Sequence, residues 1–174
     1  MLVITIIVTI MTSVKVQHNA IDNLKSINDQ KAHIIAEFVE QSETTLRQFV
    51  MADQVKNVVE NPDDEQALRE AQDYLMEFAG SLGEIEGLYI CDWNTKTLAH
   101  SNPDNIGVVT HEEEERLENL RNNLIKEGPD GIRKNVTTSP VSNKQCFVFI
   151  KPYINDAGEY IGRLIKDKYR KANK

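Results

Sequence analysis

The sequence predicts an α+β domain, in which a long N-terminal helix packs on a five-stranded antiparallel sheet. Residues 15–60 contain no glycine and no proline, and most of their apolar residues recur every three or four positions, which is helical spacing. Residues 88–99 have the pattern of a β-hairpin. Three further apolar or alternating stretches after residue 130, separated by turn residues, predict the remaining strands.

The long helix is expected over Lys15–Glu60, with Ile21, Leu24 and Phe38 among its apolar positions. At 1.5 Å per residue it would be about 65 Å long, which exceeds the diameter of a small domain. One end must therefore extend beyond the domain or pack on another chain. A homodimer seam is one interpretation, and a helix that only covers the sheet is the other.

The first fourteen residues, Met1–Val14, are uncharged and mostly aliphatic. A membrane-spanning helix needs about 20 apolar residues, so this stretch is short. It also lacks the basic start and small-residue cleavage site of a signal peptide. Three interpretations stay open: the outer part of a transmembrane helix, an atypical export signal, or a buried core segment.

Two shorter helices have recognisable ends. Asn61 is expected to cap a helix with Pro62 at its first position, and Gly80 to end it. Thr110 and Glu113 match a capping box, and that helix should run to Gly128.

The hairpin is expected to comprise Leu88–Cys91, a turn at Asp92–Thr95 and a second strand at Thr97–Ala99. Residues His100–Pro103 end it, and Gly107 closes the following loop. The other strands are predicted at Ile132–Ser139, Gln145–Lys151 and Tyr160–Ile165, joined by turns at residues 140–144 and 155–158.

Composition and motifs exclude several functions. The formal net charge of -7 argues against nucleic-acid binding, which needs a basic patch. No nucleophile elbow, phosphate loop, dinucleotide fingerprint or calcium loop occurs, so we expect neither an enzyme nor a cofactor. His111 and the four glutamates after it predict a solvated first helical turn rather than a metal site. Cys91 and Cys146 favour buried free thiols, and one disulfide is the alternative.

The chain resembles a known family at residues 86–107. A strand, a tight Asp/Asn turn, a second strand ending in Leu-Ala-His, then Asn-Pro and Ile-Gly are similar to the central hairpin of Cache sensor domains. These are extracytoplasmic ligand-binding modules of bacterial chemoreceptors, sensor kinases and cyclic-dinucleotide enzymes. The resemblance covers about Lys15 to Gly162 and implies a PAS-like sheet with strand order 2-1-5-4-3. The polar tail after Lys166 departs from the family, whose members usually continue into further elements.

The resemblance also implies where a ligand would bind: against the sheet, under a lid formed by Asn102–Lys126. Arg133 is the best candidate for an anionic group, because its planar fork matches a carboxylate. A surface charge is the alternative role for Arg133, and His100 could simply bond loop backbone. The only tryptophan, Trp93, lies in the hairpin turn, so the family's amino-acid-binding signature is absent. The candidate ligand-binding residues are Tyr89, His100, Arg133, Asn135 and Tyr153.

The hypothesis is therefore an extracytoplasmic small-molecule sensor of a bacterial transmembrane receptor, which signals to the membrane through the long N-terminal helix. The expected organisation is a partial transmembrane helix or export signal at 1–14, a sensor domain at 15–166 and a polar tail at 167–174. The rival is a structural or dimerisation module without a ligand. The two differ in whether an internal cavity is lined by polar groups or packed shut.

Overall fold

The computed structural model describes residues 2–83, 85–139 and 143–169, and the chain divides into two compact units, Met1–Gln41 and Ser42–Lys174. The described residues of the first unit all belong to helix α1 (Leu2–Val50), which runs on into the second unit. Among the residues described, no helix is long and apolar enough to cross a membrane. The division of the chain at residues 14 and 166 stays a prediction.

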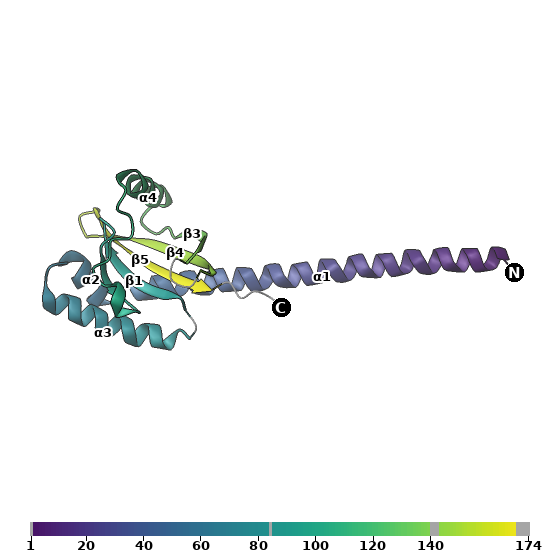
Figure 1. Ribbon diagram of the computed structural model, residues 1–174, viewed down its shortest axis with the longest axis horizontal. Coiled ribbons are helices and arrows are strands. Elements are labelled where there is room, and N and C mark those ends of the chain that lie inside the picture. Colours follow the sequence, from purple (N-terminus) through teal and green to yellow (C-terminus); the bar gives the residue numbers. More distant parts are fainter. Residues whose placement is uncertain (1, 84, 140–142, 170–174) are drawn as a thin grey trace. The chain divides into compact units, whose positions relative to one another are not determined.

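The second unit holds the sheet and three further helices (Figure 1). The helices are α2 (Asp53–Glu60), α3 (Glu65–Ser81) and α4 (Glu114–Glu127), with a short 3-10 helix, η1 (Pro103–Asn105), before α4. The strands are β1 (Gly87–Asp92), β2 (Thr97–His100), β3 (Arg133–Thr138), β4 (Gln145–Ile154) and β5 (Tyr160–Tyr169). They form one antiparallel sheet of order β2-β1-β5-β4-β3, which confirms the predicted α+β class and strand order.

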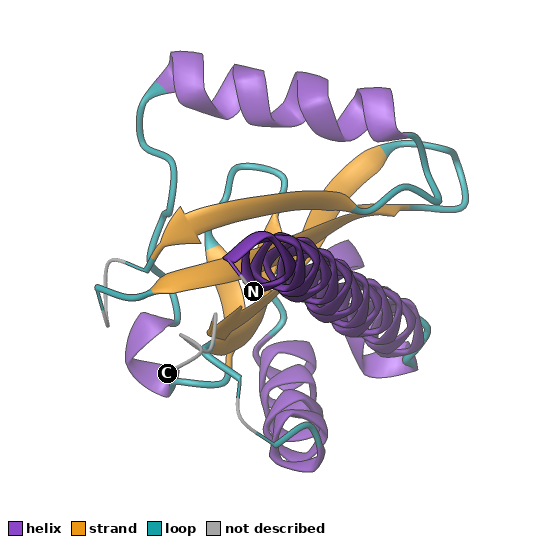
Figure 2. Cartoon of the chain, turned by 90° about the vertical axis from the view of Figure 1, so that its right-hand side faces the viewer, coloured by secondary structure: helices purple, strands orange, loops and turns teal. Residues whose placement is uncertain are grey.

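The two faces of the sheet have different coverings. Helices α2 and α3 contact β1, and α4 contacts β3 and β4 from the opposite side (Figure 2). We call the first the helix face. Its strand residues pack with α1, α2 and α3 into a fully buried core that includes Phe49, Val55, Leu75, Leu88, Ile90 and Leu164. A Cβ on Gly162 would lie 2.5 Å from Val59 Cγ1, so this position needs glycine for α2 to approach β5.

The predicted continuous helix over 15–60 is wrong at one point, because α1 ends at Val50 and α2 begins at Asp53. Ala52 is extended (ψ 139°), although the sequence there contains neither glycine nor proline. Phe49 and Val55 are both fully buried. In an unbroken helix, six residues at 3.6 per turn would place them on different sides. The break lets both side chains face the same core.

Both predicted N-caps are also wrong. Asn61 caps the end of α2 instead, and Asp64 caps α3 by accepting a hydrogen bond from the Gln66 backbone N–H at 2.8 Å. Helix α4 begins at Glu114, three residues later than the expected first turn after Thr110. The backbone N–H of Thr110 donates to Thr95 O, so pairing with the hairpin replaces the capping box.

Strands β4 and β5 are longer than predicted, running to Ile154 and Tyr169. The ladder on both sides of the central β5 satisfies its backbone groups, which outweighs the polar composition of its end. Asp167 therefore lies in a strand and not in a tail, whereas residues 170–174 lie outside the described residues, as do 140–142 of the predicted turn. Cys91 and Cys146 are buried free thiols, as the sequence favoured.

Candidate functional site

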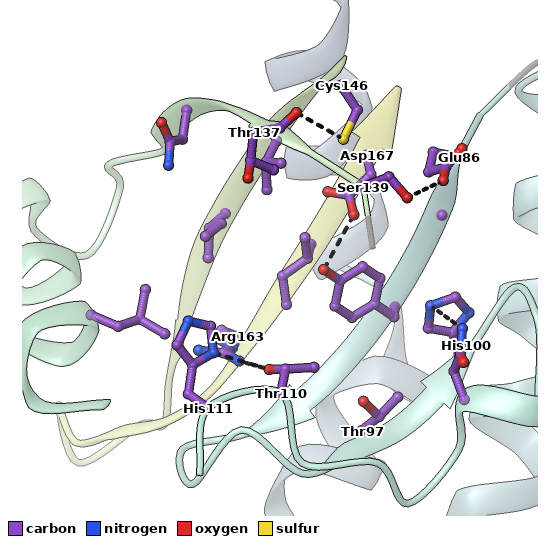
Figure 3. A pocket seen from close by; sticks show the side chains of 18 of the residues that line it. Glu86, Thr97, His100, Thr110, His111, Thr137, Ser139, Cys146, Arg163 and Asp167 are labelled. Carbon is purple, nitrogen blue, oxygen red and sulfur yellow. Dashed lines mark hydrogen bonds between the residues drawn. The ribbon is translucent and has the colours of Figure 1, made fainter. Parts of the chain in front are cut away.

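A cavity of about 600 Å³ lies on the side of the sheet opposite the helix face. We call this side of the sheet the cavity face. Alternate strand residues form its floor, because successive side chains in a strand point to opposite faces. Three of these floor residues, Arg163, Ile165 and Asp167, come from β5. The loop before α4 and residues of α4 line it from other directions (Figure 3).

Arg163 dominates one end of the cavity. It is only 3% exposed, although it carries a permanent charge. One terminal nitrogen (Nη2) donates to Thr110 Oγ1 at 2.8 Å. In the part of the chain that the structure describes, its Nε has no hydrogen-bond partner. Burial lowers the pKa of the adjacent His111, and the guanidinium groups of Arg163 and Arg116 lower it further.

Acidic groups gather at the other end (Figure 3). Tyr89 OH donates to Asp167 Oδ2 at 3.3 Å, and Ser139 Oγ donates to Glu86 Oε1. Oδ1 of Asp167 is buried and, within the described residues, accepts no hydrogen bond. Burial raises the pKa of Asp167 from 3.8 to about 7, with the Tyr89 hydrogen bond opposing the shift and the Glu86 charge adding to it. Burial, and then the Asp167 charge, raise the pKa of Tyr89 well above its usual value.

The middle of the cavity floor is mostly apolar. Ile165 and Val148 lie there, in one buried cluster with Cys146. The Tyr89 ring stacks on His100 with centroids 4.8 Å apart and an interplanar angle of 18°. Burial lowers the pKa of His100, so its ring is neutral at pH 7. Its Nδ1 accepts a hydrogen bond from the Asn102 backbone N–H at 2.8 Å, which fixes the ring over the loop.

Residues 107–111, which we call the strap, hold the loop against the outer edge of β2. Thr97 N donates to Val108 O at 2.9 Å, and Gly107 N donates to Thr97 O at 2.8 Å. Gly107 has φ 83°, a left-handed conformation that favours glycine. The buried Thr95 Oγ1 accepts from the His111 backbone N–H at 3.1 Å. The strap thereby positions Thr110 and His111 at the Arg163 end.

Arg121 fastens α4 to the hairpin turn. Its Nε donates to Trp93 O at 3.2 Å, its Nη2 donates to Asn94 Oδ1 at 2.6 Å, and its guanidinium carbon lies 5.9 Å from the Trp93 ring centroid. The predicted lid is thus tied down at a second point, beyond the strap.

Four of the five predicted site residues line the cavity: Tyr89, His100, Arg133 and Asn135. Tyr153 does not. It has the same strand parity as Phe149 and points to the helix face, where the charges of Glu60 and Lys56 act on it.

Sequence reasoning missed Arg163 and Asp167, although a signal for Arg163 was present. The predicted strand order made the strand that contains Arg163 the centre of the sheet. A charged residue in a central strand is buried and therefore a candidate for a functional role.

The cavity is lined by charged, polar and apolar groups together. Within the described ranges, no group of three or more His, Cys, Asp or Glu side chains is arranged to hold a metal ion. What the site offers is a buried guanidinium, a carboxyl pair and an apolar floor between them.

No protein-family model and no curated protein sequence matches this chain. Solved structures do match it. The sensor domain of the Vibrio cholerae histidine kinase DctB is 14% identical, with a TM-score of 0.71 over 88% of this chain and 57% of that one. The Campylobacter jejuni chemoreceptor Tlp3 sensory domain, with isoleucine bound, is 15% identical, with a TM-score of 0.56 over 78% and 53%. The Escherichia coli DcuS sensor domain is 11% identical, with a TM-score of 0.50 over 75% and 86%.

At these identities the likeness shows the fold, which is that of Cache (PAS-like) sensor domains of histidine kinases and chemoreceptors. The resemblance predicted from the sequence is confirmed at that level. The chain spans a little over half the length of the DctB and Tlp3 domains that it matches.

Proposed function

We propose that this chain is the extracytoplasmic small-molecule-binding sensor domain of a bacterial transmembrane signalling receptor, and not an enzyme. The observation that carries the proposal is the cavity of about 600 Å³ with the buried Arg163 in its wall. A buried charge that lacks a counter-charge is costly, and such groups persist where a ligand supplies the partner. A module that served only to dimerise would gain stability from an apolar, closed interior. The sheet arrangement shared with histidine-kinase and chemoreceptor sensor domains supports the same proposal.

The route from ligand to membrane would run through β3 and α1. Lys134 Nζ donates to Glu43 Oε1, which links β3 to the part of α1 in the second unit. Its strand neighbours Arg133 and Asn135 line the cavity. A ligand that binds one position of β3 better than another would move this link, and the equilibrium shifts only by that difference in affinity. The N-terminal residues would then connect the helix to the membrane.

A homodimer through α1 is part of the proposal. A seven-residue spacing relates three aliphatic residues of α1: Val14, Ile21 and Ile35. Each of them is at least half exposed, as is Leu24, which follows Ile21 by three residues. Asn28 occupies the position of the same seven-residue spacing that lies between Ile21 and Ile35. β-branched residues at the first heptad position, leucine at the fourth and one buried asparagine are typical of parallel two-stranded coiled coils. Sedimentation of the Ile21→Lys, Leu24→Lys double variant should show monomer where the parent is a dimer.

Thermal unfolding against a metabolite panel tests the sensor function. The panel contains amino acids, short carboxylates, amines and nucleobases. A specific ligand at 100 times its Kd should add about 2.7 kcal/mol to the free energy of unfolding. The exposed Arg69→Ala variant should respond like the parent. A folded protein that responds to no compound, and that retains no molecule detectable by native mass spectrometry, would favour the dimerisation module.

A further inference from the structure

Two buried polar atoms without partners face the same cavity from one strand. Among the residues that the structure describes, Arg163 Nε donates no hydrogen bond and Asp167 Oδ1 accepts none. Such orphan atoms are rare in folded proteins and call for an explanation. Both residues belong to β5 and, with Ile165, line the cavity.

The guanidinium end is suited to an anionic oxygen group. Nη2 of Arg163 donates to a neutral hydroxyl, that of Thr110, and its other side-chain partner is the weakly accepting Cys91 thiol. A carboxylate is planar and matches the guanidinium fork, so it would engage Nε together with a terminal nitrogen. Arg116 lines the same cavity, and its charge would add to the positive potential there.

The opposite end is suited to an ammonium group. Asp167 and Glu86 bring two carboxyl groups together, and both charges act on the Cys146 thiol beside them. The Tyr89 hydroxyl donates to one oxygen of Asp167, and the Ser139 hydroxyl donates to one oxygen of Glu86. The remaining Asp167 oxygen needs a donor, which an amine would provide.

The spacing of the two ends sets the length of the ligand. Arg163 pairs across the sheet with Cys91, and Asp167 pairs with Gly87, so the two side chains start from well-separated levels of β5. Four residues of a strand cover about 13 Å. The floor between them is Ile165, with Val148 beside it on β4. An α-amino acid has its two charges on one carbon and could not reach both ends.

We propose that the cavity selects an elongated dipolar molecule, in which an apolar stem separates a carboxylate held by Arg163 from an amine held by Asp167 and Glu86. ω-Amino carboxylates are the simplest members of this class. This assignment rests on the proposed sensor function and specifies its ligand.

Isothermal titration calorimetry of the full chain with ε-aminocaproate and three relatives tests the assignment. Norleucine is its isomer with the amine on the α-carbon, adipate replaces the amine by a second carboxylate, and hexylamine lacks the carboxylate. We expect ε-aminocaproate to bind about tenfold or more tighter than each of them. Arg163→Gln and Asp167→Asn should each weaken it by a similar factor, whereas the exposed-site controls Arg69→Gln and Asp156→Asn should not.

The order of the four affinities for the wild-type protein tests the assignment even where a variant fails to fold. If norleucine or adipate binds as tightly as ε-aminocaproate, the dipolar assignment is wrong and the sensor function stands. If none of the four binds, the assignment is also wrong, and the sensor function is then judged by the broader panel alone. Unchanged affinity in folded Arg163→Gln or Asp167→Asn protein would overturn the assignment as well.

Discussion

The helix face and the cavity face are built from alternate residues of the same strands, yet one is a closed apolar core and the other contains buried charged groups. On the helix face, Leu88, Ile90 and Leu164 are fully buried against α1, α2 and α3. On the cavity face, Arg163 and Asp167 are buried with polar atoms that lack partners in the described structure. The first face supplies stability, and the second retains buried polar groups that have no partner among the described residues. Changes on the two faces should therefore differ in both size and sign.

The sharpest test of this contrast compares two adjacent residues of β5. Leu164→Ala on the helix face should lower the free energy of unfolding by about 3–5 kcal/mol, because it leaves a hole in a closed core. Ile165→Ala should cost less, about 2 kcal/mol, because the neighbouring cavity already admits solvent or ligand. Urea denaturation of both variants measures the difference. Equal losses would contradict the contrast between the faces.

The pH dependence of stability should identify Asp167. Its pKa rises from 3.8 to about 7 on folding, so the folded protein holds the proton more tightly than the unfolded chain. Stability should fall as the pH rises from 3.8 to about 7, by about 4 kcal/mol, and then level off. Asp167→Asn should remove that slope. Denaturation curves at several pH values test this, and an unchanged slope in the variant would assign the effect to other groups.

Replacing the buried cation should stabilise the free protein. Arg163→Met removes a desolvated charge while keeping much of its volume, so we expect the free energy of unfolding to rise by about 1 kcal/mol. Any ligand-induced shift should disappear in the same variant. Arg133→Met, at a half-buried position of the edge strand β3, is the matched control. A loss of stability in Arg163→Met would mean that Arg163 serves the fold itself.

The smallest effect is expected at the junction of α4 and the hairpin. Arg121→Ala loses the contacts to Trp93 and Asn94, and partly exposed interactions of this kind contribute about 0.5–1 kcal/mol. Hydrogen exchange should nevertheless accelerate in α4 more than in α3, because this contact fastens the lid and not the core. Uniform acceleration across both helices would show that α4 is part of the core unit.

Most of the fold was accessible from the sequence because spacing and turn chemistry act locally. The hairpin was confirmed, with its turn at Asp92–Thr95 and the end of the following loop at Gly107. The break after Val50 was not predicted, because nothing in the local sequence marks it. It arises where Phe49 and Val55 both enter one core. The N-caps failed for a related reason, since Thr110 forms a sheet-like pair with Thr95 and is no longer available as a cap.

The candidate site was accessible only in part. Tyr89, His100, Arg133 and Asn135 do line one cavity, but the decisive charges come from β5. Tyr153 was misplaced because residue type was weighed without strand parity. The burial of Arg163 and Asp167 follows from the topology of the whole sheet, and their missing partners follow from side-chain geometry that no sequence pattern specifies.

The strap has a consequence for the solubility of the protein. By pairing with Thr97, residues Gly107 and Val108 occupy backbone groups that an edge strand would otherwise present to other chains. The opposite edge, β3, keeps Lys134 and other polar residues exposed, which discourages strand addition in another way. The position of Thr110 and His111 in the cavity wall and the protection of the β2 edge thus depend on the same few hydrogen bonds. A mutation that loosens the strap to widen the cavity would also expose an edge on which aggregates can grow.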